Sequence, residues 1–186
     1  MAAELHHSER LVRILSTEQN LSILRHVAAL GLPDCWVAAG FVRNGAWDHL
    51  HGYAASPLND VDVIYFDAQD CSAGRDAELQ QVLASRCGLT RWEVKNQARM
   101  HLRHPDRPYQ DCADAMGFWP EKETAIAVRL SAGGELEINA PFGLESLFAL
   151  ELTYNPARPI DLYKERILVK GWLQRWPELR PTGCKL

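Results

Sequence analysis

The chain has 186 residues, and its 47% hydrophobic content is enough to fill the core of one compact domain. Its formal net charge of −4 argues against tight, nonspecific binding of nucleic acid, for which a strongly basic domain is expected. The sequence has no apolar run near the roughly 20 residues that span a bilayer, and its acidic first residues lack the apolar core of a secretory signal, so we expect a cytoplasmic protein.

Helical periodicity over residues 8–30 predicts two helices, and a short buried strand is predicted at 35–39. The next helix opens at Gly40. A strand that runs into a glycine and then a helix exposes unpaired backbone N–H groups, which attract phosphate oxygens together with the helix dipole. Gly40 lets a ligand approach the backbone, Arg43 adds a forked cation, and Asn44 offers a neutral amide. The alternative for such a glycine is ordinary turn chemistry.

Residues 59–66 form the most informative stretch, because they predict a strand with two carboxylates on one face. Side chains alternate along a strand that rises about 3.3 Å per residue, so Asp60 and Asp62 point the same way, roughly 6 to 7 Å apart at Cα. Carboxylates are the hard oxygen ligands that Mg²⁺ prefers, and the pair could hold Mg²⁺ or Mn²⁺. The alternative is an acidic, solvated start of a strand.

After a helix near residues 77–84, a third strand is predicted at 92–95. Lys95, Asn96 and Arg99 lie on or just beyond it, where they could contact a ligand. If the strand continues, alternation places Lys95 and Arg99 on one face. The alternative is a strand edge that charge protects from pairing.

A hairpin follows, with strands at 124–130 and 136–139 joined by a turn at 133–134. Glu137 lies between two apolar residues, so it faces away from the side that they fill, toward a metal or toward water. Glu135 has the same orientation and stays open as an alternative.

Two helices are predicted beyond the hairpin, over residues 142–152 and 162–176. Charge is unevenly distributed: residues 86–107 hold six Lys or Arg against two acids, and residues 158–186 hold seven against three. Two basic segments facing an acidic pair would suit a phosphorylated ligand that carries a cation. Solvated helix faces are the alternative for the second segment.

Several segments resemble known nucleotidyltransferases. Gly40-Phe41-Val42-Arg43-Asn44, Leu50-His51-Gly52 and Asp60-Val61-Asp62 resemble the head-domain signature of poly(A) polymerases and CCA-adding enzymes, in the DNA polymerase beta superfamily. The chain departs from that pattern at Ala39, Asn44 and His51, which replace a glycine, an aspartate and a leucine. A closer resemblance is to a group of bacterial nucleotidyltransferase-like proteins. It is carried by residues 95–101, 114–116, 119–121, 124–125 and 140–144.

The resemblance implies an α+β fold, a DNA polymerase beta-like mixed sheet of about five strands flanked by helices. Residues 1–186 are then a single nucleotidyltransferase-like domain. Its parts are N-terminal helices at 1–33, a catalytic core at 34–145 and C-terminal helices at 146–186.

The resemblance also implies Mg-dependent transfer of a nucleoside monophosphate from a nucleoside triphosphate. Glu137 matches the third carboxylate of the resembled family. The implied catalytic and metal-binding residues are Asp60, Asp62 and Glu137. The implied nucleotide-binding residues are Gly40, Arg43, Asn44, Lys95, Asn96 and Arg99.

The expected acceptor is a hydroxyl group on a small molecule or a protein. The roughly 40 residues after the core can build only one or two helices, so we do not expect a long nucleic acid to bind, and no membrane contact is expected. The alternative function is a catalytically silent module on the same fold, which recognises a nucleotide or a partner protein through residues 95–101.

Overall fold

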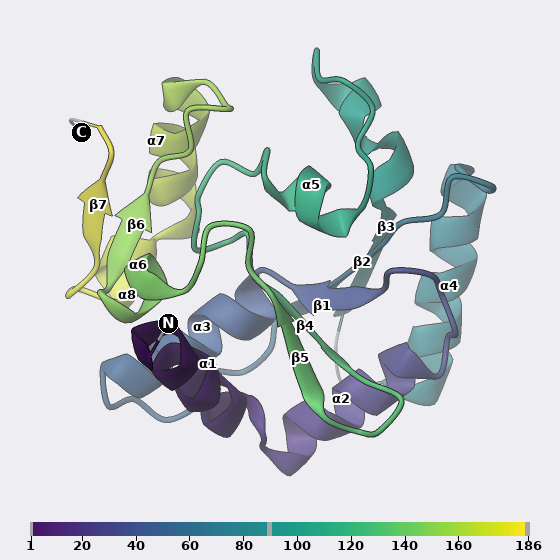
Figure 1. Cartoon of the computed structure of the whole chain (residues 1–186), viewed down its shortest axis with the longest axis horizontal. Helices are drawn as coiled ribbons and strands as arrows, with labels where there is room; N and C mark the ends of the chain where they lie inside the picture. Colours follow the sequence, from purple (N-terminus) through teal and green to yellow (C-terminus); the bar gives the residue numbers. More distant parts are fainter. Residues whose placement is uncertain (1, 89–90, 185–186) are drawn as a thin grey trace.

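The computed structural model describes residues 2–88 and 91–184. Figure 1 shows a central sheet with helices around it and a group of short elements toward the carboxyl end. The helices are α1 (Ala2–Leu15), α2 (Glu18–Ala28), α3 (Gly40–Leu50), α4 (Ala73–Arg86), the 3₁₀ helix η1 (Gln97–Arg103), α5 (Cys112–Met116), α6 (Glu145–Phe148), α7 (Ile160–Lys170) and α8 (Trp172–Arg175). The strands are β1 (Trp36–Ala38), β2 (Asp60–Tyr65), β3 (Arg91–Asn96), β4 (Ala127–Leu130), β5 (Leu136–Asn139), β6 (Glu151–Thr153) and β7 (Arg180–Thr182). In the part described, no helix combines the length and the apolar character needed to cross a bilayer.

The central sheet has five strands in the order β3-β2-β1-β4-β5. β2 and β3 run parallel, and the other neighbouring strands run antiparallel. The predicted mixed sheet flanked by helices is therefore confirmed. Each strand that the sequence predicted for this sheet is present, with ends that shift by up to three residues.

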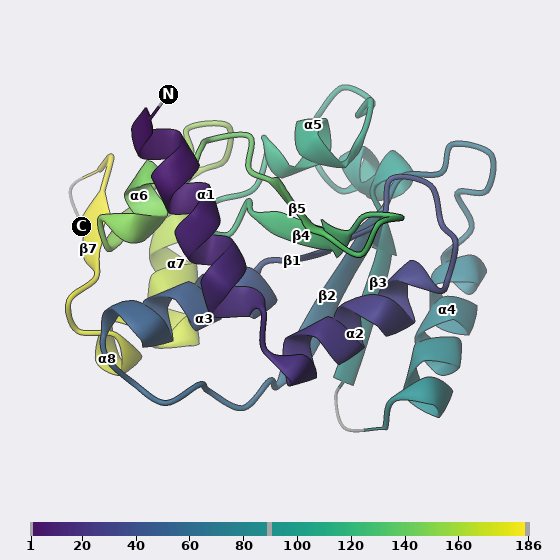
Figure 2. The ribbon, with the colours of Figure 1, turned by 60° about the horizontal axis from the view of Figure 1, so that its bottom comes forward.

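Adjacent rows of side chains give the two faces of the sheet opposite characters. One row crosses all five strands through Val94, Val63, Val37, Val128 and Ile138. Apolar side chains of α2 and α4 cover this row in the main core, and α2 crosses the sheet in Figure 2. The next row contains Glu93, Asp62, Ala38, Ala127 and Asn139. Because side chains alternate along a strand, this second row faces the other side.

The second face is only partly covered by apolar side chains. Cys112 and Met116 of α5 pack there against Trp36, Ala38 and Ile64, in a cluster separate from the main core. The apolar cover over the middle of β1 and β2 therefore adjoins the acidic start of β2.

The carboxyl-terminal part differs from the prediction of two helices. α6 ends at Phe148, and Leu150 has a positive φ of 55°, after which β6 forms. Gly171, with φ 62°, separates α7 from α8. β6 and β7 pair in parallel in a second, two-stranded sheet. Strands of three residues are too short to show an alternating pattern, so the sequence did not indicate them.

β3 ends at Asn96, so the strand does not continue to Arg99. The Asn96 side-chain oxygen accepts hydrogen bonds from the backbone N–H groups of Asp67 (3.1 Å) and Ala98 (3.0 Å). Its NH₂ group donates to the carbonyl oxygens of Asp67 (2.7 Å) and Asp70 (2.8 Å). This buried amide has then filled its two donor and two acceptor positions within the protein. Asn96 caps η1 and anchors the loop after β2.

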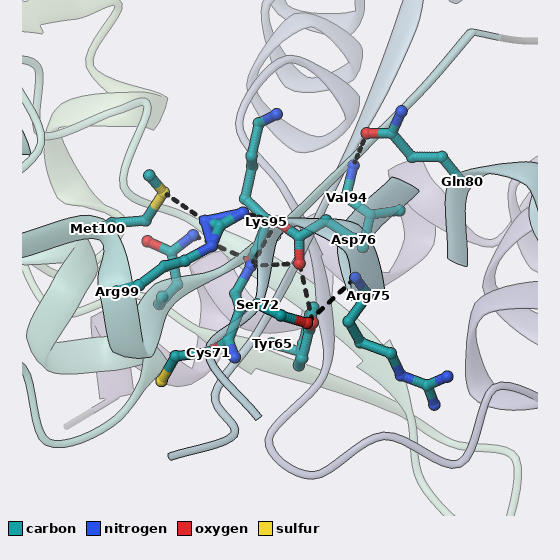
Figure 3. A network of polar contacts seen from close by, with 12 residues as sticks. Tyr65, Cys71, Ser72, Arg75, Asp76, Gln80, Val94, Lys95, Arg99 and Met100 are labelled. Carbon is teal, nitrogen blue, oxygen red and sulfur yellow. Dashed lines mark hydrogen bonds and ion pairs between the residues drawn. The ribbon is translucent and has the colours of Figure 1, made fainter. Parts of the chain in front are cut away.

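The carboxylate of Asp76, in α4, links the carboxyl ends of β2 and β3 to η1, as Figure 3 shows. This carboxylate accepts hydrogen bonds from the Tyr65 hydroxyl (2.8 Å) and the Asn96 backbone N–H (3.2 Å), and it forms an ion pair with Arg99. Because both charged side chains are largely buried, removal of either one would leave an uncompensated charge. This network fixes α4 against the sheet.

We predict that Asn96→Ala lowers the free energy of unfolding by about 2 kcal/mol or more, because it leaves buried backbone groups without partners. Urea denaturation followed by circular dichroism measures the change. Gln69→Ala is the matched control, an exposed amide in the anchored loop, for which we expect a change within about 0.5 kcal/mol. Equal stability of the two variants would contradict the anchoring role.

Candidate active site

Asp60 and Asp62 lie on one face at the start of β2, as the sequence predicted, and both are partly buried. Asp62 is aligned with Ala38 on β1 and with Glu93 on β3. The parallel pairing of β2 with β3 thus brings a third carboxylate next to the pair. Glu93 also forms an ion pair with Arg91 at 3.3 Å on the same strand.

The electrostatic environment of Asp62 is unfavourable to its charge. Burial is the largest of the causes that raise the pKa of Asp62 to about 6, and repulsion from Asp60 and Glu93 acts in the same direction. Arg43 and Lys170 lower this pKa, although by less. Asp62 is therefore a partly buried acid whose negative charge lacks full compensation from the protein.

This donor set fits a divalent cation. The described residues contain no group of three His, Cys, Asp or Glu side chains that could hold a metal ion by themselves. Mg²⁺ does not need such a cage, because it is usually held by one or two carboxylates together with phosphate oxygens and water. Asp60 and Asp62 are ligands of that kind, and a cation would compensate the charge that burial disfavours.

The turn before α3 has a strained backbone at the position where the resembled family has glycine. Ala39 has φ 55° and ψ −119°, a conformation that costs an L-residue about 1–3 kcal/mol. The Ala39 N–H donates to the carbonyl of Ile126, and its own carbonyl accepts from the N–H groups of Val42 and Arg43. These bonds hold the turn, and the helix begins directly at Gly40.

The predicted phosphate-binding residues Gly40, Arg43 and Asn44 lie together. A Cβ atom added to Gly40 would lie 3.4 Å from Asn44 Nδ2 and 3.7 Å from Arg43 Nη2, so both side chains lie within contact distance of this position. The Arg43 Nε donates to Asn44 Oδ1 at 3.2 Å. Gly40 is partly exposed and lines an open cleft, so the start of α3 is accessible.

Arg43, which the sequence predicted to bind phosphate, is itself buried. Its guanidinium donates to the Thr124 hydroxyl at 2.5 Å and lies 4.5 Å from the ring centre of Trp172 and 5.2 Å from that of Trp47. Burial lowers the pKa of Arg43 to about 10. The charge of Arg43 lowers the pKa of Asp62, and its contacts with Trp47 and Trp172 link α3 to α8.

The structure does not bring Glu137 to the aspartate pair. Glu137 is on the edge strand β5, where its carboxylate accepts from Arg129 Nε at 2.6 Å. Three strand spacings separate β5 from β2, or about 14 Å. The alternative, Glu135, is exposed beside the hairpin turn. Hairpin alternation gives the face of Glu137 but not its distance from β2.

Of the three residues predicted on or after β3, Lys95 alone shares the face that carries Glu93. Figure 3 shows its side chain directed away from Asp76 and Arg99. The side-chain amide of Asn96 makes all of its hydrogen bonds within the protein, and Arg99 forms an ion pair with Asp76 of α4. The polar groups of Asn96 and Arg99 therefore serve the fold.

Sequence reasoning missed Glu93 and Lys170 as parts of the site. The alternation of Trp92, Glu93, Val94 and Lys95 shows that Glu93 and Lys95 share a face, but not that β3 aligns in parallel with β2. Lys170 falls within the predicted helix at 162–176, and it lies in the last turn of α7, close enough to influence Asp62. Both positions depend on non-local packing, through the register of β3 with β2 for Glu93 and through the position of α7 for Lys170.

A cleft of about 550 Å³ lies beside the aspartate pair. Its lining includes Gly40, Asn44 and Asp60, together with residues of α1 and of the segment that precedes β2. Three residues predicted from sequence thus border one open space.

Comparisons with known proteins agree with this geometry. A family described as nucleotidyltransferase matches residues 25–180. A solved structure described as revealing a CCA-adding enzyme head domain is 30% identical, with a TM-score of 0.84, and the match covers 95% of this chain and 96% of that one. No curated protein gives a significant match.

Larger enzymes share the fold. A CCA-adding enzyme in complex with CTP is 15% identical, with a TM-score of 0.57, over 94% of this chain and 43% of that one. A tRNA nucleotidyltransferase with a primer tRNA and an incoming ATP analogue is 18% identical, with a TM-score of 0.51, over 87% of this chain and 46% of that one. The chain spans less than half the length of these enzymes.

The family match covers most of the chain, and the 30% identical structure matches over nearly the full length of both proteins. Together with the mixed sheet and the carboxylates of β2, these similarities show that the chain belongs to this nucleotidyltransferase family, related to the head domain of CCA-adding enzymes.

Proposed function

We propose that this nucleotidyltransferase moves a nucleoside monophosphate from a nucleoside triphosphate to a hydroxyl group of a small molecule or a protein, with Mg²⁺ or Mn²⁺ as cofactor. The observation that carries the proposal is the partly buried carboxylate of Asp62, whose charge the protein does not fully compensate, on one face with Asp60 and Glu93. Groups with a strongly perturbed pKa and a specific charged neighbour gather at functional sites. We also propose cytoplasmic residence.

Asp60 and Asp62 would hold the cation, with Glu93 as the third acid in place of Glu137. A bound divalent cation would lower the pKa of an attacking hydroxyl and neutralise charge on the departing pyrophosphate. Asp62 and Glu93 are adjacent across parallel strands, so a rigid sheet would fix the acids relative to one another. Glu137 is instead neutralised by Arg129.

The triphosphate would lie at the start of α3. The accessible backbone at Gly40 and the Asn44 amide offer hydrogen bonds to phosphate oxygens, and the buried charge of Arg43 adds to the positive end of the helix. Lys170 and Lys95 are the flexible cations that could follow the terminal phosphates. The CTP and ATP-analogue complexes of the larger enzymes support a nucleoside triphosphate as the donor.

The acceptor is proposed as a small molecule or a protein because the net charge of −4 offers little attraction to a long polynucleotide. A catalytically silent binding module on the same fold is the second candidate. The site favours the enzyme, since holding several acids together costs free energy for which a binding module has no physical need.

We predict that Asp60→Asn and Asp62→Asn each lower cation-dependent pyrophosphate release by at least about a hundredfold, because each removes a charged oxygen ligand. Release is measured with each of the four triphosphates, Mg²⁺ or Mn²⁺, and pooled hydroxyl and protein acceptors. Unchanged turnover in both variants would refute the proposal. Nucleotide-dependent thermal stabilisation without any product would favour the silent module.

The same assay distinguishes the two candidates for the third acid. We expect Glu93→Gln to lower pyrophosphate release by about tenfold or more, and Glu137→Gln to change it by less than about twofold, since an exposed ion pair contributes little. The opposite order of effects would restore Glu137 as the third carboxylate.

The raised pKa of Asp62 gives a pH-dependent prediction for the metal-free protein. Because the native pKa of about 6 is above the ordinary value of 3.8, protonation of Asp62 stabilises the native state. This contribution is complete below about pH 4 and is lost as the pH rises through about 6. Relative to Asp62→Asn, the wild type should therefore lose about 2 kcal/mol of unfolding free energy between pH 4 and pH 8.

Urea titrations of both proteins in EDTA across this range measure the difference, in which the contributions of groups that do not interact with Asp62 cancel. A difference that does not vary with pH would show that Asp62 is not held in the disfavoured charged form.

A further inference from the structure

The cleft beside Asp60 has a basic wall that the transfer of a nucleotide does not by itself require. It is bordered by α1, by α3 and by the segment from Tyr53 to Asp60, and its volume is about 550 Å³. Pockets of about 300–1,000 Å³ are typical for small-molecule ligands. The cleft therefore has the size of a metabolite site.

α1 provides the basic wall through one side of the helix. Leu11 and Leu15 are buried in the main core, whereas Arg10, Arg13 and Ile14 line the cleft. The helical period separates these two sets, since residues three or four apart share a side. The core contacts of α1 thus hold its two arginines toward the open space.

The charges of these arginines are available to a ligand. Among the residues whose side chains are described, neither Arg10 nor Arg13 forms an ion pair. The guanidinium of Arg10 lies 4.6 Å from the ring centre of Phe148, and Arg13 is exposed. Two guanidinium groups three residues apart suit an oxyanion, because each can present paired N–H donors to phosphate or carboxylate oxygens.

The acidic groups of the cleft differ in their availability. Asp48 accepts hydrogen bonds from the Trp176 indole N–H (2.9 Å) and from the Ser56 backbone N–H (2.8 Å), so its two oxygens are engaged. Asp60 lines the cleft and also lies on the face of β2 that carries Asp62. A ligand held by the arginines would thus be next to the proposed cation site.

We propose that the α1 side of this cleft binds the acceptor, while Gly40 and Asn44 on the α3 side remain for the triphosphate, and that the acceptor is a small hydroxylated compound that carries a phosphate or carboxylate group. The inference rests on the proposed function, because it places the acceptor hydroxyl next to Asp60. In the transfer, the acceptor oxygen bonds to the α-phosphorus of the triphosphate and the bond from that phosphorus to the pyrophosphate oxygen breaks. The hydroxyl proton passes to water, and pyrophosphate leaves.

Binding of a simple anion tests the site without knowledge of the acceptor. Inorganic phosphate and acetate are titrated separately into the full chain by calorimetry, in EDTA at constant ionic strength. We expect one of them to bind the wild type, and Arg10→Gln/Arg13→Gln to bind it at least about tenfold more weakly, since charge-assisted hydrogen bonds are lost. Preferential binding of phosphate or of acetate identifies the anionic group of the acceptor.

Arg86→Gln/Arg103→Gln is the matched control. It removes the same charge from exposed arginines of α4 and η1, neither of which lines the cleft, and should bind like the wild type. Circular dichroism checks that the double variant Arg10→Gln/Arg13→Gln is folded. If it is not folded, the single variant Arg13→Gln, which changes an exposed residue, is used in its place. Unchanged affinity in a folded Arg13→Gln, or no binding of either anion by the wild type, overturns the inference.

Asp62→Asn separates this inference from the proposed function. The variant should lose pyrophosphate release and keep the affinity of the wild type for the anion, because Asp62 does not line the cleft. Loss of anion binding in Asp62→Asn would place the anion at the aspartate pair and overturn the cleft assignment. Anion binding that depends on Arg10 and Arg13 can still be established if the wild type releases no pyrophosphate.

Discussion

The alignment of β2 between β1 and β3 is the constraint on which the rest of the structure depends. It places Val63 in a row of β-branched side chains that crosses the sheet under the helices, and it places Asp62 in the neighbouring row on the other face. A shift of one residue would bury both aspartates in the core and expose the valines. The apolar row therefore stabilises the register, and the register in turn holds Asp62 beside Glu93 despite their mutual repulsion.

The sequence predicts well those features that depend on local pattern. Alternation gave the strand with Asp60 and Asp62, and the strand, glycine and helix in succession gave the turn at Gly40. Local pattern does not indicate the proposed third acid, Glu93, because its position depends on which strand lies next to β2 and in which direction that strand runs. A hairpin makes Glu137 visible to sequence reasoning, whereas the parallel pairing that brings Glu93 to Asp62 follows a helical connection through α4.

Polar residues near a predicted site can have structural roles that only the packing reveals. Asn96 and Arg43 are both suited to bind a nucleotide, yet the amide of one holds a loop and the guanidinium of the other contacts two tryptophans. In each case burial requires a partner for the polar group, and the protein supplies it. Arg43 nevertheless influences Asp62, because a charge in a poorly hydrated environment acts over a longer distance than an exposed one.

α3 connects the features that the proposed reaction requires. Its first turn follows the strained Ala39 and borders the aspartate pair, and its length runs along the cleft. Its last turn carries Asp48, which holds both Trp176 of the carboxyl-terminal segment and the chain before β2. The backbone strain at Ala39 is tolerated because helix, sheet and carboxyl-terminal segment all fix the position of α3. Donor and acceptor would then be held on one rigid helix, so that their relative position is set by the fold before either binds.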